Sequence, residues 1–233
     1  MLENSSALWL EDLPRPQVDG HKYDRGHTVI VGGYPLTGAA RLAAMAAARI
    51  GSGLTTILAP EDAFPVYAAA LTSIMVKPFS SRPAFRKLVS EIRATAFLLG
   101  PGAGTGAETR EQALTLLATG TPLVLDADGL NVFSGEPSLL ANARKGPVVL
   151  TPHEGEYARL FGPVTNREKC VLSAATQTGA IVVLKGHSTL IGSPDGALVC
   201  NVAASPDLAT AGSGDVLSGL KPAIFSAHYD SPL

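Results

Sequence analysis

The residues that could do chemistry are densest near the end of the chain, in Gly212-Ser213-Gly214-Asp215. An apolar segment with helical spacing follows, so this turn stands at the start of a predicted helix. Its backbone N–H groups and the helix dipole form an anion hole that suits a phosphate. Asp215 falls in the first helical turn, where a carboxylate would repel a bound phosphate. We therefore interpret Asp215 as a general base acting on the group that receives the phosphate, with helix capping as the alternative.

A second glycine-rich segment, residues 100–106, lies between an apolar run and a helical one. Its four glycines would let the backbone approach a ligand closely. The stretch from Gly102 also fits G-x-G-x-x-A, with Asp126 after the next apolar run, as in a dinucleotide-binding unit. That fingerprint normally opens its domain, whereas other strands come first in this chain. Besides a ligand-binding loop and a dinucleotide-binding unit, a plain tight turn is a third alternative for this segment.

Carboxylates and an amide follow the apolar run of residues 123–125, in the order Asp126, Asp128 and Asn131. At the end of a strand, such oxygen ligands could orient a substrate or hold Mg²⁺ through water. Asp128 could equally cap the helix that follows. The sequence leaves these two alternatives open.

His153 stands between Pro152 and two glutamates after the apolar run of residues 148–150. No second histidine or cysteine has ligand spacing, so we expect no zinc and assign no metal ligands. The alternative to a ligand site is a set of solvated charges at a helix start. Lys185 and Gly186 follow a further apolar run, where a strand-end lysine suits a phosphate or a ribose edge.

The composition narrows the class of partner. Lys and Arg number 18 and Asp and Glu 20, without a basic run, so we expect neither nucleic acid nor an anionic membrane as a partner. Cys170 and Cys200 have no metal-type spacing, and such thiols suit a reducing cytoplasm. No window approaches the roughly 18 apolar residues of a membrane span, and residues 1–16 do not resemble a signal peptide.

Short apolar runs alternate along the chain with Ala- and Leu-rich segments of helical spacing. Runs without polar alternation predict strands covered on both faces, so we expect one α/β domain, a three-layer α/β/α sandwich with a mostly parallel central sheet. The expected strands are residues 28–31, 54–58, 96–99, 123–125, 148–150, 181–184, 189–191 and 198–200, the last two joined by a hairpin turn at 193–196. The expected helices are residues 39–50, 107–117, 154–161 and 167–178, with one more starting at residue 60.

Several motifs in order give the chain a family resemblance. The segment 209–215 resembles the signature of ribokinase-like proteins, which implies a ribokinase-like fold. Within that superfamily the chain resembles the ADP/ATP-dependent NAD(P)H-hydrate dehydratases. Six ordered segments carry this resemblance, over roughly residues 20 to 220: residues 22–27, 37–43, 100–104, 125–131, 151–156 and 184–186.

The resemblance implies that ADP or ATP phosphorylates the hydroxyl of hydrated NADH or NADPH, with Mg²⁺ neutralising the phosphates, and that elimination of phosphate restores the nicotinamide. It implies hydrate contacts at Ala39, Gly102, His153 and Asp215. It places the nucleotide on Lys185, Gly186, His187, Ser188, Thr189 and Gly214. Asp215 would be the base, and the transferring phosphoryl group would be stabilised by Gly212, Ser213 and Gly214. The form of residues 151–156 resembles the bacterial, ADP-using branch of the family. The resemblance also implies a homo-oligomer, often a tetramer. We expect no hydrate-epimerase domain in this sequence, although some relatives carry one as a fusion.

We expect an N-terminal extension (residues 1–20), a dehydratase domain (21–220) and an atypical tail (221–233). The tail departs from the family's apolar helix, as a truncated or altered C-terminus would, and Pro222 predicts an interrupted helix. Two alternatives remain for the function. One is a ribokinase-like kinase for a vitamin precursor or a sugar; the other is a non-catalytic nucleotide-binding remnant.

Overall fold

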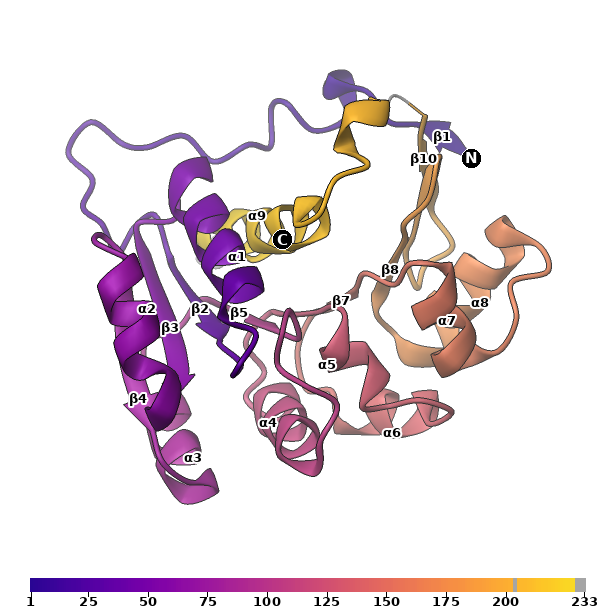
Figure 1. Cartoon of the computed structure of the whole chain (residues 1–233). Helices are drawn as coiled ribbons and strands as arrows, with labels where there is room; N and C mark the ends of the chain where they lie inside the picture. Colours follow the sequence, from indigo (N-terminus) through magenta and orange to yellow (C-terminus); the bar gives the residue numbers. More distant parts are fainter. Residues whose placement is uncertain (203–204, 229–233) are drawn as a thin grey trace.

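The computed structural model describes residues 1–202 and 205–228 and confirms a three-layer α/β/α sandwich around a mostly parallel sheet (Figure 1). The strands are β1 (Leu2–Glu3), β2 (His27–Val31), β3 (Leu54–Pro60), β4 (Met75–Phe79), β5 (Ala96–Leu99), β6 (Leu123–Leu125), β7 (Val148–Leu150), β8 (Ile181–Leu184), β9 (Thr189–Gly192) and β10 (Leu198–Asn201). The α-helices are α1 (Thr37–Ile50), α2 (Phe64–Ala70), α3 (Arg82–Glu91), α4 (Ala107–Leu117), α5 (Asp128–Asn131), α6 (Pro137–Ala143), α7 (Glu154–Phe161), α8 (Arg167–Thr178) and α9 (Ser213–His228).

The sheet has the order β1-β10-β9-β8-β7-β6-β5-β2-β3-β4. From β8 to β4 all neighbours are parallel, whereas β9 is antiparallel to both β8 and β10, which confirms the predicted hairpin. Leu99, Leu125 and Leu150 lie opposite one another in register, so β5, β6 and β7 end level. The loops that leave these strands therefore meet at one edge of the sheet.

Both faces of the central strands are buried, which explains why their sequences do not alternate between apolar and polar residues. Leu99 and Leu125 belong to the cluster packed under α3 to α8, whereas Leu98, Val124 and Val149 belong to the cluster packed under α1, α2 and α9. Figure 1 shows α1 and α9 side by side on their face of the sheet.

The predicted break at Pro222 is wrong, because α9 runs through it. Pro222 removes one backbone N–H, yet the helix is held by its contacts with α1 and the sheet. Gly219 lies so close to α1 that an added Cβ would stand 2.0 Å from the Ala43 carbonyl oxygen. Tertiary packing thus outweighs the local cost of the proline. Residues 229–233 of the predicted tail lie outside the described residues.

The other boundaries differ in detail. Helix α1 begins at Thr37 rather than residue 39, and the helix expected at residue 60 is a 3₁₀ turn (Glu61–Ala63) followed by α2. Strand β1, which pairs with β10, and the segment from β4 to α3 had no counterpart among the expected elements. Within residues 1–202 and 205–228, none of the helices combines the length and the apolar character that a bilayer crossing requires.

Candidate functional site

The loops after β2 and β5 touch where the strand order reverses. These strands are neighbours in the sheet, but the chain leaves them in opposite directions, toward β3 and toward β6. A Cβ on Gly33 would stand 1.7 Å from the Gly102 carbonyl oxygen, so the two backbones lie in direct contact. Gly102 has a positive φ of 70° and lies against the Leu36 carbonyl, one turn before Ala39 in α1. The sequence-predicted pair Ala39 and Gly102 therefore shares one edge of the sheet.

The predicted anion-binding turn, residues 212–215 (the anion turn), begins at Gly212, whose φ of 86° is a left-handed conformation that favours glycine. An added Cβ there would meet the Leu42 side chain at 2.6 Å, so this turn packs against the first half of α1. Ser213 and Gly214 start α9, and Asp215 lies in its first turn, half-buried. Burial raises the pKa of Asp215, the charge of Asp126 raises it further, and Lys185 opposes the rise. Burial and the Asp126 charge thus both favour an Asp215 carboxylate that accepts a proton readily.

Asp126, at the end of β6, is 2 % exposed and holds two partners. Its Oδ1 lies 2.7 Å from Lys185 Nζ, and its Oδ2 accepts a hydrogen bond of 2.5 Å from Ser218 Oγ on α9. Burial alone would raise the pKa of Asp126, but the Lys185 charge and hydrogen bonds from Lys185, Ser218 and Thr151 lower it. The carboxylate is therefore ionised, and it links β6, β8 and α9.

The structure bears on the dinucleotide alternative and on the capping alternative for Asp128, whereas the role of these oxygens toward a substrate or Mg²⁺ stays a prediction. Asp126 is buried by its partners rather than exposed to a ribose, which argues against the dinucleotide fingerprint. Asp128 is the first residue of α5 and not its cap; its Oδ2 accepts a hydrogen bond of 2.8 Å from the Gly104 backbone N–H. It thereby fixes the glycine-rich loop over the end of β6.

His153 is the N-cap of α7. Its Nδ1 accepts hydrogen bonds from the Gly155 and Glu156 N–H groups, while Glu156 Oε2 accepts one of 2.8 Å from the His153 N–H. The contacts of His153 are therefore those of a residue at a helix start. The role of His153 toward the substrate stays a prediction. His153 also forms a backbone bridge with Lys185, so these two predicted site residues are neighbours at the sheet edge.

A residue that the sequence did not single out braces the predicted nucleotide loop, residues 185–189. The Arg167 guanidinium, from the start of α8, donates to the Ser188 carbonyl at 2.8 Å and to Glu154 at 2.9 Å. An added Cβ on Gly186 would lie 2.7 Å from this guanidinium, so the glycine makes room for it. Arg167 opens a helix and belongs to no motif, and only its tertiary contacts reveal the role.

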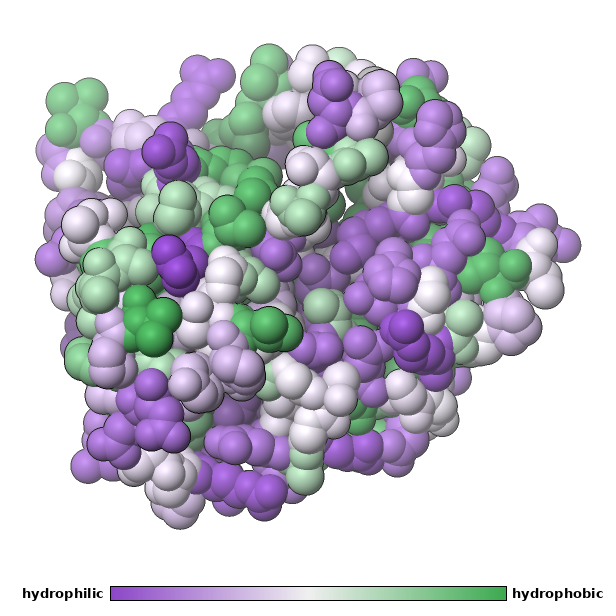
Figure 2. Space-filling view, viewed as in Figure 1, coloured by the Kyte–Doolittle hydropathy of each residue, from purple (hydrophilic) through white to green (hydrophobic). Residues whose placement is uncertain are grey.

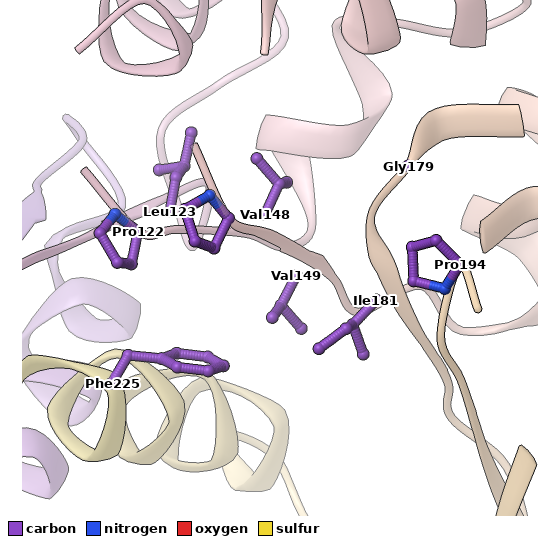
Figure 3. A pocket seen from close by; sticks show the side chains of 9 residues that line it. Pro122, Leu123, Val148, Val149, Gly179, Ile181, Pro194 and Phe225 are labelled. Atoms are coloured by element: carbon purple, nitrogen blue, oxygen red, sulfur yellow. The ribbon is translucent and has the colours of Figure 1, made fainter. Parts of the chain in front are cut away.

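An apolar cavity of about 130 Å³ lies elsewhere (Figure 3). Phe225 of α9 faces Val149 and Ile181 across it, and Pro122 and Leu123 mark the start of β6. These residues lie toward the amino ends of the strands, opposite the polar loops. The cavity is therefore separate from the candidate site.

Comparisons with known proteins agree with this geometry. The family model described as NAD(P)H-hydrate dehydratase matches residues 27–232. A bifunctional NAD(P)H-hydrate repair enzyme from Salinibacter ruber is 40 % identical over 220 residues, 88 % of this chain and 41 % of that protein. One from Moorella thermoacetica is 37 % identical over 231 residues, 92 % of this chain and 43 % of that protein. The chain thus spans about two fifths of the length of these curated relatives.

Solved structures are similar as well. The ADP/ATP-dependent NAD(P)H-hydrate dehydratase of Bacillus subtilis, co-crystallised with ATP and Mg²⁺, has a TM-score of 0.77 and 30 % identity, covering 93 % of this chain and 82 % of that one. A ribokinase-like superfamily protein from Enterococcus faecalis has a TM-score of 0.82 and 26 % identity, covering 97 % and 80 %. The layered sheet is therefore that of the ribokinase-like class. Within that class, this chain belongs to the NAD(P)H-hydrate dehydratase family.

Proposed function

We propose that the protein is an ADP-dependent NAD(P)H-hydrate dehydratase, a hydro-lyase with ADP (or ATP) as the phosphoryl donor. The observation that carries the proposal is the position of Asp215. It follows directly on the anion turn, burial raises its pKa, and Lys185 lies close enough to affect it electrostatically. A base and a phosphate-binding turn are thus adjacent, as transfer of a phosphoryl group to a hydroxyl requires.

The proposed reaction has two steps. The hydroxyl oxygen of the hydrate attacks the terminal phosphorus of the nucleotide, Asp215 takes the hydroxyl proton, and AMP leaves when ADP is the donor. The C–O bond of the phosphorylated hydrate then breaks and inorganic phosphate departs with the bonding electrons. The neighbouring ring carbon loses a proton, which restores the double bond of the reduced nicotinamide.

The proposed roles follow the geometry of the loops. The hydrate would lie over the reversal point of the sheet, against Ala39, Gly102, His153 and Asp215. The nucleotide would lie on the loop after β8 and on the start of α9, contacting Lys185, Gly186, His187, Ser188, Thr189 and Gly214. The N–H groups of Gly212, Ser213 and Gly214 would stabilise the transferring phosphoryl group.

Mg²⁺ fits this site as a partner of the nucleotide. No group of three or more His, Cys, Asp or Glu side chains among the described residues could hold a metal ion by itself. Because Mg²⁺ keeps several waters and binds mainly through substrate phosphates, such a protein cage is unnecessary. When bound, the ion would neutralise phosphate charge. Asp215, half-buried in the first turn of α9, is an acidic side chain beside the proposed phosphate-binding turn.

The direct test follows recovery of the near-ultraviolet absorbance of reduced nicotinamide when the protein meets hydrated NADH, Mg²⁺ and ADP. No ADP-dependent recovery by a folded sample would refute the proposal. A persistent phosphorylated product would favour the small-molecule kinase, and ADP binding without turnover would favour the non-catalytic remnant.

Asp215→Asn tests the base. We expect turnover to fall about 10²–10⁴-fold, because a positioned proton acceptor is lost. ADP affinity, measured by calorimetry, should hold or rise, since a negative charge beside the phosphates is removed. Folding should survive because asparagine is nearly isosteric with aspartate. Near-normal turnover would remove Asp215 from the mechanism.

We also propose a homotetramer. Helix α1 and the start of α9 carry four exposed apolar side chains, Leu42, Met45, Val216 and Leu217. Figure 2 shows hydrophobic residues at this face of the molecule. Light scattering of the purified protein would determine the assembly. A cytoplasmic location agrees with Cys170 and Cys200 both being free thiols.

A further inference from the structure

Three parts of the candidate site are joined by a single buried carboxylate. Asp126 Oδ1 holds Lys185 Nζ at 2.7 Å, and its Oδ2 holds Ser218 Oγ at 2.5 Å. Ser218 is 1 % exposed, and its Oγ also lies 2.9 Å from the carbonyl of Gly214, one turn earlier in α9. The hydroxyl has one proton, and the shorter contact to a charged acceptor is the stronger. Asp126 is thereby connected to both the nucleotide loop and the anion turn.

The connection is direct and spans distant parts of the chain. Lys185 directly follows β8, and Gly214 lies in the first turn of α9. Asp126, at the end of β6, connects the two, because it contacts Lys185 directly and Gly214 through Ser218. A charge that is almost fully buried is costly unless it is paired, so this contact set has little freedom to rearrange. Glu156 Oε2 lies 3.8 Å from Lys185 Nζ and is the second acidic group at the lysine.

We propose that Asp126 is a positioning residue that sets the separation between the Lys185 ammonium and the α9 turn carrying Gly214 and Asp215. This inference rests on the proposed function, in which Lys185 contacts the nucleotide and Asp215 takes the hydroxyl proton. Phosphoryl transfer depends on the alignment of donor and acceptor, so a fixed distance between these groups raises the rate. Asp126 itself touches neither reactant.

The contact between Asp126 and Lys185 is tested by a double-mutant cycle on ADP affinity, measured by calorimetry with Mg²⁺ present. Asp126→Asn should weaken ADP binding by about fivefold or more in the wild-type background, because Lys185 loses its anchor. In a Lys185→Met background the same change should alter ADP binding by less than about twofold. Equal weakening in both backgrounds would overturn the inference. Tighter binding would overturn it too, because Asp126 would then only repel phosphate.

The contact between Asp126 and Ser218 of α9 is tested with variants of Ser218. These variants also test the inference if Asp126→Asn fails to fold. Ser218→Ala should lower kcat about tenfold with ADP affinity unchanged, and Ser218→Thr, which keeps the hydroxyl, should restore kcat. Ser90→Ala is the matched control, since Ser90 Oγ also donates to a carbonyl of its own helix, that of Lys87, but at an exposed position of α3.

Equal losses of kcat in Ser218→Ala and Ser218→Thr would assign the effect to packing and overturn the inference. The proposed function is judged separately. If the wild-type protein turns over no hydrate, that proposal fails, whereas the ADP-binding cycle still decides whether Asp126 acts through Lys185.

Discussion

Replacement of Lys221 by methionine is expected to stabilise the protein at neutral pH. Lys221 lies inside α9, and its Nζ is buried without a hydrogen-bond acceptor in the part of the chain that the structure describes, although its stem is half-exposed. Burial lowers the pKa of Lys221 to about 8; the charge of Asp126 opposes this fall and that of Lys185 adds to it. At neutral pH the folded protein therefore carries a poorly solvated charge.

The size of the effect follows from proton linkage. A fall from 10.5 to about 8, at about 1.4 kcal/mol per pKa unit, corresponds to about 3 kcal/mol. Between these pH values the unfolded chain keeps the proton that the folded chain has lost, so the free energy of unfolding rises with pH across that window. Lys221→Met removes the charge and should raise the unfolding free energy at pH 7 by up to about 3 kcal/mol. This is roughly 6–12 °C in Tm for a chain of this size.

The assay is urea unfolding at neutral pH and near the upper end of the window, for the wild type and Lys221→Met. The wild type should gain stability relative to the variant as the pH rises. Lys87→Met is the matched control, because Lys87 is 74 % exposed and pairs with Glu91 at the surface; it should shift stability by less than about 0.5 kcal/mol. A variant less stable than the wild type at neutral pH would refute the reasoning, since Lys221 would then have a favourable partner.

Three further changes probe the packing and the site. Gly219→Ala should lower the free energy of unfolding by about 3 kcal/mol in urea, because its Cβ would stand 2.0 Å from the Ala43 carbonyl oxygen; an unchanged value would show that α1 and α9 can separate freely. Arg167→Met should weaken ADP binding roughly fivefold by calorimetry, because the loop carbonyl of Ser188 loses its donor; unaltered affinity would exclude a bracing role. Burial lowers the pKa of His27, so stability should fall as the pH drops below about 6.5, and less steeply in His27→Gln; identical slopes would contradict this.

The bounds of the central strands could be predicted to the residue because each strand is an uninterrupted apolar run that differs from the sequence around it. Strands β5, β6, β7 and β8 are uniformly apolar, and each has glycine, proline or a charged residue next to at least one of its ends. Strand β4 could not be found in this way, since Lys77 and Pro78 interrupt its apolar pattern. It lies at the edge of the sheet, where a proline and an exposed charge are tolerated.

The loops of the site were predictable for a topological reason, whereas the contacts between them were not. Parallel strands end at one edge, so Gly102, His153 and Lys185 had to lie near one another. Ser218 and Arg167 lie within helices, where serine and arginine are common on solvent-facing surfaces. The one signal for Ser218 was its spacing of four residues from Gly214, which puts both on one helical face.

The contacts of Asp126 explain how a carboxylate can lie beside the proposed anion site. A carboxylate at Asp215 would repel an incoming phosphate, and pairing it with Lys185 would remove that repulsion but weaken it as a base. Lys185 is instead bound to Asp126 at 2.7 Å, and the Asp126 charge together with burial raises the pKa of Asp215. In the proposed reaction Asp215 becomes neutral when it takes the hydroxyl proton, so the repulsion disappears as the phosphoryl group arrives. In the proposed mechanism, the same ion pair therefore keeps a cation at the proposed nucleotide loop and preserves the basicity of Asp215.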